Sequence, residues 1–134
     1  MPASPKPQKL IPNKPLRDHI SQMPCLVRGC PHKVAYHHLR SIGAGGRDLF
    51  NLIPLCYHEH HTSGIHTMPD NDFEKKHSLP DLKSLAIILT VGFFGAEKSV
   101  EKLAVMRGID MESAEAIILD AIDNCNNEAK NWVG

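Results

Sequence analysis

The 134-residue chain has room for one domain, or for a small core with an appendage, and its 15 basic and 15 acidic residues give no net charge. Its longest apolar run, residues 85–91, is too short to span a bilayer, and its proline-rich start lacks the apolar region of a secretory signal. We therefore expect a cytoplasmic protein that does not bind a membrane.

The charge is divided unevenly along the sequence. Residues 1–47 hold eight Lys or Arg and one acid, whereas residues 48–134 hold seven Lys or Arg and 14 acids. This asymmetry indicates a polyanionic partner for the basic half, and nucleic acid is the first candidate. Residues 1–23 are rich in proline and lysine with little apolar periodicity, so we expect them to form a basic, flexible arm.

The next segment, residues 24–78, predicts a small α+β core. Two cysteines separated by four residues, with a glycine before the second, have the spacing of a zinc knuckle. Residues 33–39 predict a short strand that ends in two histidines, and residues 41–47 predict an irregular loop because they include three glycines. Residues 48–55 predict a second strand, followed by a helix that begins at Cys56 and ends near Gly64.

Residues 79–134 predict a helical appendage. The apolar residues 82–94 favour a buried helix, and residues 99–107 favour a shorter helix that closes near Gly108. Asp110 is a good N-cap for a final helix. We expect these helices to pack on the core, on a second copy of the chain or on a protein partner.

Six of the nine histidines lie between residues 37 and 66, a density that packing does not require but metal binding does. Neighbouring side chains of a strand point to opposite faces, so His37 and His38 cannot easily share an ion. One of them is expected to bind metal and the other to move a proton. For His19, His32 and His77 we favour ordinary packed or surface positions.

Three cysteines share this neighbourhood: Cys25, Cys30 and Cys56. We interpret them as metal ligands, and the distant Cys125 as a small buried apolar residue. The alternative interpretation of the cysteines is a secreted protein in which they form disulfides.

The His37-His38 pair, the glycine loop, the run Asn51-Leu-Ile-Pro-Leu-Cys56 and the following histidines occur together in one order. In this order the segment 25–77 resembles the HNH endonucleases, the ββα-metal nuclease family, and especially their small phage or prophage members. The resemblance implies a zinc-stabilised ββα-metal core that hydrolyses DNA to 5′-phosphate products. For a phage-encoded protein it implies a location in the bacterial host cell.

The resemblance also implies roles for individual residues. His37 would bind a catalytic divalent metal, which could be Mg²⁺, Mn²⁺, Ni²⁺ or Zn²⁺, and His38 would be the general base that activates water. Asn51 would brace the loop so that the base is aimed correctly. His61 would be the helix ligand of the catalytic metal, and His66 a further ligand.

Many HNH proteins hold a structural zinc with two Cys-x-x-Cys pairs, and this chain departs from both. Because residues i and i+4 of a helix share a face, a Cys3His zinc site is plausible. Its ligands would be Cys25, Cys30, Cys56 and His60. Counting from Asn51 also permits a second register, in which His60 joins the catalytic site and His58 the structural one.

Arg40 and Arg47 lie in the loop between the proposed base and Asn51, where they are placed to hold phosphates, and Lys33 adds a third basic group. DNA is the expected partner, with RNA as a second possibility. The competing hypothesis is a zinc-stabilised module that binds nucleic acid or a partner without catalysis. His38 argues against it, because a purely structural site does not need this residue.

Overall fold

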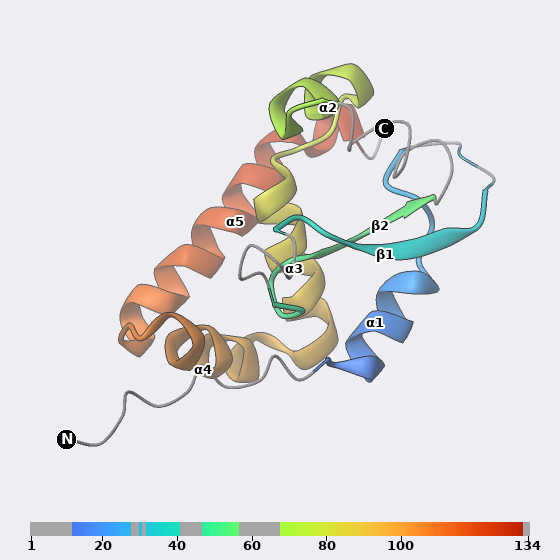
Figure 1. The fold of residues 1–134 in the computed structure, drawn as a ribbon. Coiled ribbons are helices and arrows are strands. Elements are labelled where there is room, and N and C mark those ends of the chain that lie inside the picture. Colours follow the sequence, from blue (N-terminus) through green and yellow to red (C-terminus); the bar gives the residue numbers. More distant parts are fainter. Residues whose placement is uncertain (1–11, 28–29, 31, 41–46, 57–67, 133–134) are drawn as a thin grey trace.

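A computed structural model describes residues 12–27, 30, 32–40, 47–56 and 68–132. This part of the chain forms a two-stranded antiparallel sheet and five helices, which confirms the predicted α+β class (Figure 1). In chain order the elements are α1 (Lys14–Ser21), β1 (Val34–His38), β2 (Leu52–Cys56), α2 (Asp70–His77), α3 (Leu82–Phe94), α4 (Ala96–Arg107) and α5 (Met111–Trp132).

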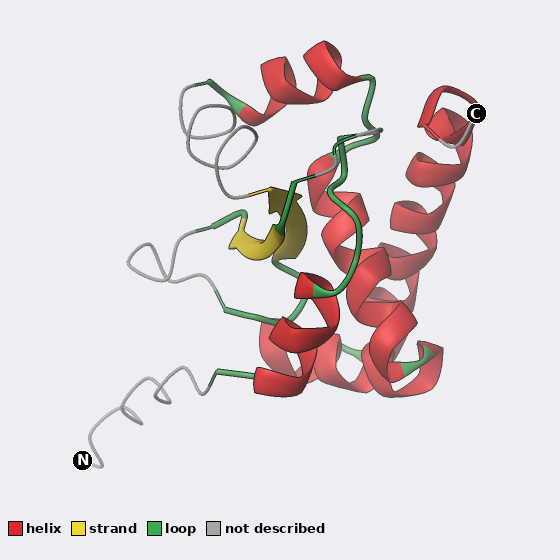
Figure 2. Cartoon of the chain, turned by 90° about the vertical axis from the view of Figure 1, so that its right-hand side faces the viewer, coloured by secondary structure: helices red, strands yellow, loops and turns green. Residues whose placement is uncertain are grey.

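The two strands form a hairpin with chemically different ends. Val34 pairs with Cys56 at one end, which we call the thiol end, and His38 pairs with Leu52 at the other, which we call the loop end. Every residue of β2 is buried, and the strand packs against α1 and α3. Figure 2 shows the C-terminal helices on one side of the hairpin. The hairpin is therefore fixed to its surroundings along its length.

The second strand begins later than predicted, because residues 48–51 form a turn. Phe50 takes a left-handed conformation with φ of 61° while its side chain is buried. The Phe50 N–H donates to the hydroxyl of Thr90 in α3, at 2.9 Å. A left-handed conformation is costly for a bulky residue, so this bond and the burial of the ring together hold the turn in place.

Helix α1 departs from the predicted flexible arm, which was wrong for residues 14–21. The Asn13 side chain caps the helix by accepting from the Leu16 N–H at 3.0 Å, and Pro15 suits the first turn. Leu16 and Ile20 are fully buried and form one cluster with Leu52. Residues 1–11, the remainder of the predicted arm, lie outside the described residues.

The C-terminal helices share a core with the hairpin. Leu82 and Leu85 of α3 belong to one buried cluster with Ile53 and Leu55 of β2 and with Phe73 of α2. Helix α3 also joins α4 and α5 in a second cluster through Ile87. The predicted buried helix over residues 82–94 is thus confirmed, and it connects the hairpin to the rest of the fold.

The predicted end of α4 and the predicted start of α5 are also confirmed. Helix α4 ends at Arg107 and is capped by Gly108, which has φ of 63°, and the Asp110 side chain accepts from the Ser113 N–H at 2.6 Å to begin α5. Helix α4 starts at Ala96, earlier than the predicted residue 99. None of the helices in the described part of the chain is long and apolar enough to cross a membrane.

Candidate functional site

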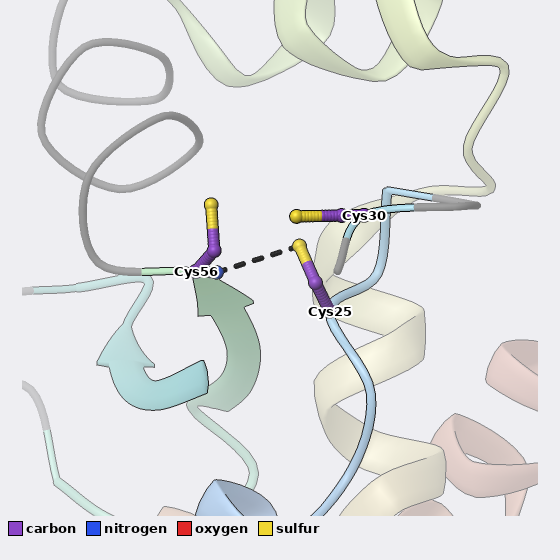
Figure 3. Close-up of side chains that lie close together, drawn as sticks. All are labelled: Cys25, Cys30 and Cys56. Atoms are coloured by element: carbon purple, nitrogen blue, oxygen red, sulfur yellow. Dashed lines mark hydrogen bonds between the residues drawn. The ribbon is translucent and has the colours of Figure 1, made fainter. Parts of the chain in front are cut away.

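Three thiols converge at the thiol end of the hairpin (Figure 3). The sulfur atoms of Cys25, Cys30 and Cys56 all lie within 4.8 Å of one another, and none of these cysteines forms a disulfide. Cys56 is the last residue of β2, so the prediction that it begins a helix was wrong, and the remainder of that predicted helix lies outside the described residues. The other two cysteines come from the segment before β1. The Cys56 N–H donates to Cys25 Sγ at 3.4 Å, which links the two segments directly.

The thiol cluster could hold a metal ion. In a tetrahedral site with metal–sulfur bonds of about 2.3 Å, the sulfurs are roughly 3.8 Å apart, so small movements would bring these three onto one ion. Burial raises the pKa of the Cys25 thiol to about 11, although the Cys56 N–H acts in the opposite direction. A bound cation would reverse this balance, because it stabilises the thiolate form.

Cys125 takes no part in this group. It is buried in the same apolar cluster as Cys25 and Cys56, in helix α5, as predicted for a small core residue. His77 packs against the Phe73 ring and His19 against the Phe93 ring, which fits the ordinary positions predicted for both, and His32 is exposed.

At the loop end, His38 is paired with a carboxylate. Its Nε2 lies 2.8 Å from Oδ1 of Asp48, and the His38 side chain is only 15% exposed. The ring also contacts Tyr36 edge to face, with 5.7 Å between ring centroids. Tyr36 and His38 therefore share one face of β1, as alternate residues of a strand should.

Asp48 is the centre of a buried polar network. Arg17 of α1 holds it with two bonds, from Nε to Oδ2 at 2.7 Å and from Nη2 to Oδ1 at 2.9 Å, and also donates to the Tyr36 hydroxyl at 3.2 Å. The Asn13 N–H adds a further bond at 2.7 Å. Burial alone would raise the pKa of Asp48, but the bonds from Arg17, His38 and Asn13 outweigh it and hold this pKa below its ordinary value.

The network fixes the chemistry available at His38. With Asp48 ionised, its oxygen can only accept, so Nε2 of His38 must donate and Nδ1 carries the lone pair. This is the form of a neutral imidazole that can take a proton, and the resulting imidazolium would be stabilised by Asp48. The arrangement can thus serve as an oriented general base.

Asp48 and Arg17 were not predicted from the sequence as site residues. Asp48 was assigned to the start of a strand, and Arg17 to the flexible arm. The bond between them spans 31 positions of the chain, so no local pattern announces it. The sequence offered only one signal for Asp48, which is its place at the start of the largely acidic half of the chain, next to Arg47.

Asn51 closes the loop that connects the strands. Its Oδ1 accepts from the Arg40 N–H at 2.8 Å, and its Nδ2 donates to the carbonyls of Arg40 and Arg47 at 2.8 and 2.7 Å. The Leu39 N–H adds a bond to the Asn51 carbonyl at 2.9 Å. These bonds hold the two ends of the loop together, a geometry that fits the bracing role predicted for Asn51.

The predicted phosphate-binding residues do not all lie together. Arg40 and Arg47 line one open cavity at the loop end. Lys33 precedes β1 at the thiol end, and the five residues of the strand, at about 3.3 Å each, separate it from them. It therefore does not belong to the same surface as the two arginines.

His37 is buried and pairs with Ile53, on the face of β1 opposite His38. The other histidines predicted as ligands lie outside the described residues: His58, His60, His61 and His66. Among the residues that the structure describes, the thiol cluster is the only group of three or more potential metal ligands that lie close together.

Comparisons of the chain with protein-family models, with curated proteins and with solved structures gave no match. No relative therefore supplies a function or a ligand. The functional argument rests on the chemistry of the thiol cluster and of the His38 network.

Proposed function

We propose that this protein is a metal-dependent endonuclease of the HNH type that hydrolyses DNA phosphodiester bonds. The observation that supports the proposal most directly is the 2.8 Å bond between His38 and Asp48. A carboxylate that orients a histidine, next to a loop with two arginines, suits proton transfer beside a phosphate. The resemblance of residues 25–77 to HNH nucleases supports the same reading.

In this proposal His38 Nδ1 accepts a proton from the water that attacks phosphorus. Asp48 keeps the imidazole oriented and stabilises its charged form. Asn51 holds the loop that carries Arg40 and Arg47, so that the scissile phosphate is presented to the base. The DNA would keep a 5′-phosphate, because the bond to the 3′ oxygen breaks.

Two metal sites complete the proposal. A catalytic divalent cation, with His37, His61 and His66 as its proposed ligands, would stabilise charge on the phosphate and on the leaving oxygen. A structural zinc would be held by the thiol cluster, with His60 as its fourth ligand. In the second register His60 would instead join the catalytic site and His58 the structural one.

Plasmid nicking tests the proposal. With Mg²⁺, Mn²⁺ or Ni²⁺ added, the wild-type chain should convert supercoiled to nicked plasmid, and DNA ligase alone should reseal the nicks because 5′-phosphates remain. His38→Ala should lower the rate roughly 100- to 10,000-fold, the usual contribution of a general base. His32→Ala is the matched control, since it removes an exposed imidazole outside the network.

One observation favours a second candidate. The bonds of Asp48 to Arg17 also tie α1 to the hairpin, which is a purely structural task. A zinc-stabilised module that binds nucleic acid or a protein partner would use the network in this way. Equal background cleavage by wild type and His38→Ala, with DNA binding intact, would establish this second function and overturn the first.

A further inference from the structure

The open cavity at the loop end is built around three arginines. It has a volume of about 340 Å³, and we call it the arginine pocket. Arg40 follows β1, Arg47 lies before the turn that leads into β2, and Arg107 is the last residue of α4. The pocket is lined by Arg40, Arg47, Leu49, Phe50, Asn51, Met106 and Arg107.

The pocket has the charge of an anion site. All three arginines are exposed, and no Asp or Glu is among the described residues that line it. Three guanidinium groups that line one cavity make its electrostatic potential positive, which favours an anionic ligand. Guanidinium also matches the geometry of phosphate better than an ammonium group does, because it can donate two parallel bonds.

The arginines are held at fixed places by their neighbours. Asn51 bonds to the backbones of Arg40 and Arg47. Phe50 is buried in a cluster with Leu103 of α4, and the neighbouring side chains of Leu49 and Met106 pack against that cluster. The end of α4 is thereby fixed against the turn, so the backbone positions that carry the three arginines are already in place when a ligand binds.

We infer that the arginine pocket binds the phosphate backbone of nucleic acid, and that Arg107 makes helix α4 part of the binding surface. The inference rests on the proposed function in taking nucleic acid as the substrate. Arg40 lies two residues after His38, so a backbone held in the pocket would pass the loop end of the hairpin, where the base is located. No pattern in the sequence places Arg107 beside Arg40 and Arg47.

Binding of a fluorescent DNA duplex tests the inference, measured by anisotropy at several NaCl concentrations without added divalent cation, so that cleavage does not interfere. Arg107→Ala should weaken binding about tenfold, as expected for a lost charged hydrogen bond. It should also lower the slope of log affinity against log salt by about 0.9, the value for one phosphate contact. Arg107→Lys should restore most of the slope.

Lys98→Ala is the matched control, since it removes the same charge from an exposed position of α4 outside the pocket. If Arg107→Ala has no larger effect than Lys98→Ala, or if the wild type does not bind DNA, the inference is wrong. A clear Arg107 effect in a chain that never cleaves would support the pocket and overturn the nuclease. Circular dichroism of each variant checks that the fold is intact.

Discussion

The two ends of the hairpin are only a few residues apart, yet one is apolar with thiols and the other carries charged side chains. At the thiol end, sulfur atoms lie within an apolar cluster that includes Ile53, Leu55 and Phe73. At the loop end, a buried carboxylate is held by a guanidinium and an imidazole. The first arrangement stabilises a fold once a cation is bound, whereas buried ion pairs add little net stability compared with apolar packing.

The contrast indicates a division between structure and function. A hairpin with one short helix buries too little surface to be stable alone, so it depends on the packing of α3. A metal ion at the thiol end would add to this stability. The charged network ties α1 to the hairpin and is costly to break, but it adds little net stability compared with apolar packing. Under the proposed function, the network serves to hold His38 in a fixed orientation.

The largest effect should come from the thiol end. Cys25→Ser should abolish zinc binding and lower the thermal midpoint by roughly 10 °C or more, because structural zinc contributes on the order of 10 kcal/mol. Cys125→Ser is the matched control: it alters a buried thiol of the same apolar cluster that is outside the thiol group. Metal analysis and thermal unfolding by circular dichroism measure both. Equal zinc content in the two variants would contradict the assignment.

The next largest effect should come from Asp48. Asp48→Ala leaves Arg17 and His38 without their shared partner, and we expect a loss of about 3 kcal/mol in the free energy of unfolding. Asp18→Ala removes an exposed ion pair, in which the side chain of Lys14 is 83% exposed and that of Asp18 is 56% exposed. This loss should cost about 0.5 kcal/mol or less in the free energy of unfolding. Urea unfolding measures both values. Similar losses would mean that the network is no more than a surface contact.

The smallest effect should be a dependence on pH. Because the folded-state pKa of Asp48 is depressed, its stabilising contribution is fully present above the unfolded value of about 3.9 and is lost as pH falls through the folded value. Urea unfolding from about pH 6 to about pH 3 should show this loss. In Asp48→Asn the decrease should be smaller, and an identical decrease would assign it to other carboxylates.

The sequence predicted those parts of the molecule that depend on local patterns. The strand over residues 33–39, the buried helix over residues 82–94 and the cap at Asp110 follow from side-chain periodicity and from capping chemistry. In these three cases the signal lies within a few residues of the feature that it predicts. The convergence of Cys25, Cys30 and Cys56 was predicted differently, from their metal-binding chemistry and from the histidines nearby, because Cys25 and Cys56 are 31 positions apart.

The features that the sequence did not predict depend on distant partners. Helix α1 offers only Leu16 and Ile20 as apolar residues at helical spacing, and it owes its place to burial against Leu52 and to the bond between Arg17 and Asp48. Arg107 shares a cavity with Arg40 and Arg47 because α4 packs beside the turn that contains Phe50. The bond between Arg17 and Asp48 joins residues 31 positions apart, and local periodicity carries no information about such a pair.

The bond between the Phe50 N–H and the Thr90 hydroxyl limits how far this protein can be truncated from its C-terminal end. Thr90 lies in α3, beyond any boundary drawn after residue 78, yet it holds the turn that carries Asp48 and Asn51 into place. A fragment ending at residue 78 would lack this hydroxyl and would expose the apolar residues of β2 that α3 covers. The segment up to residue 78 is therefore not a transferable module, and it has to be moved or isolated together with α3.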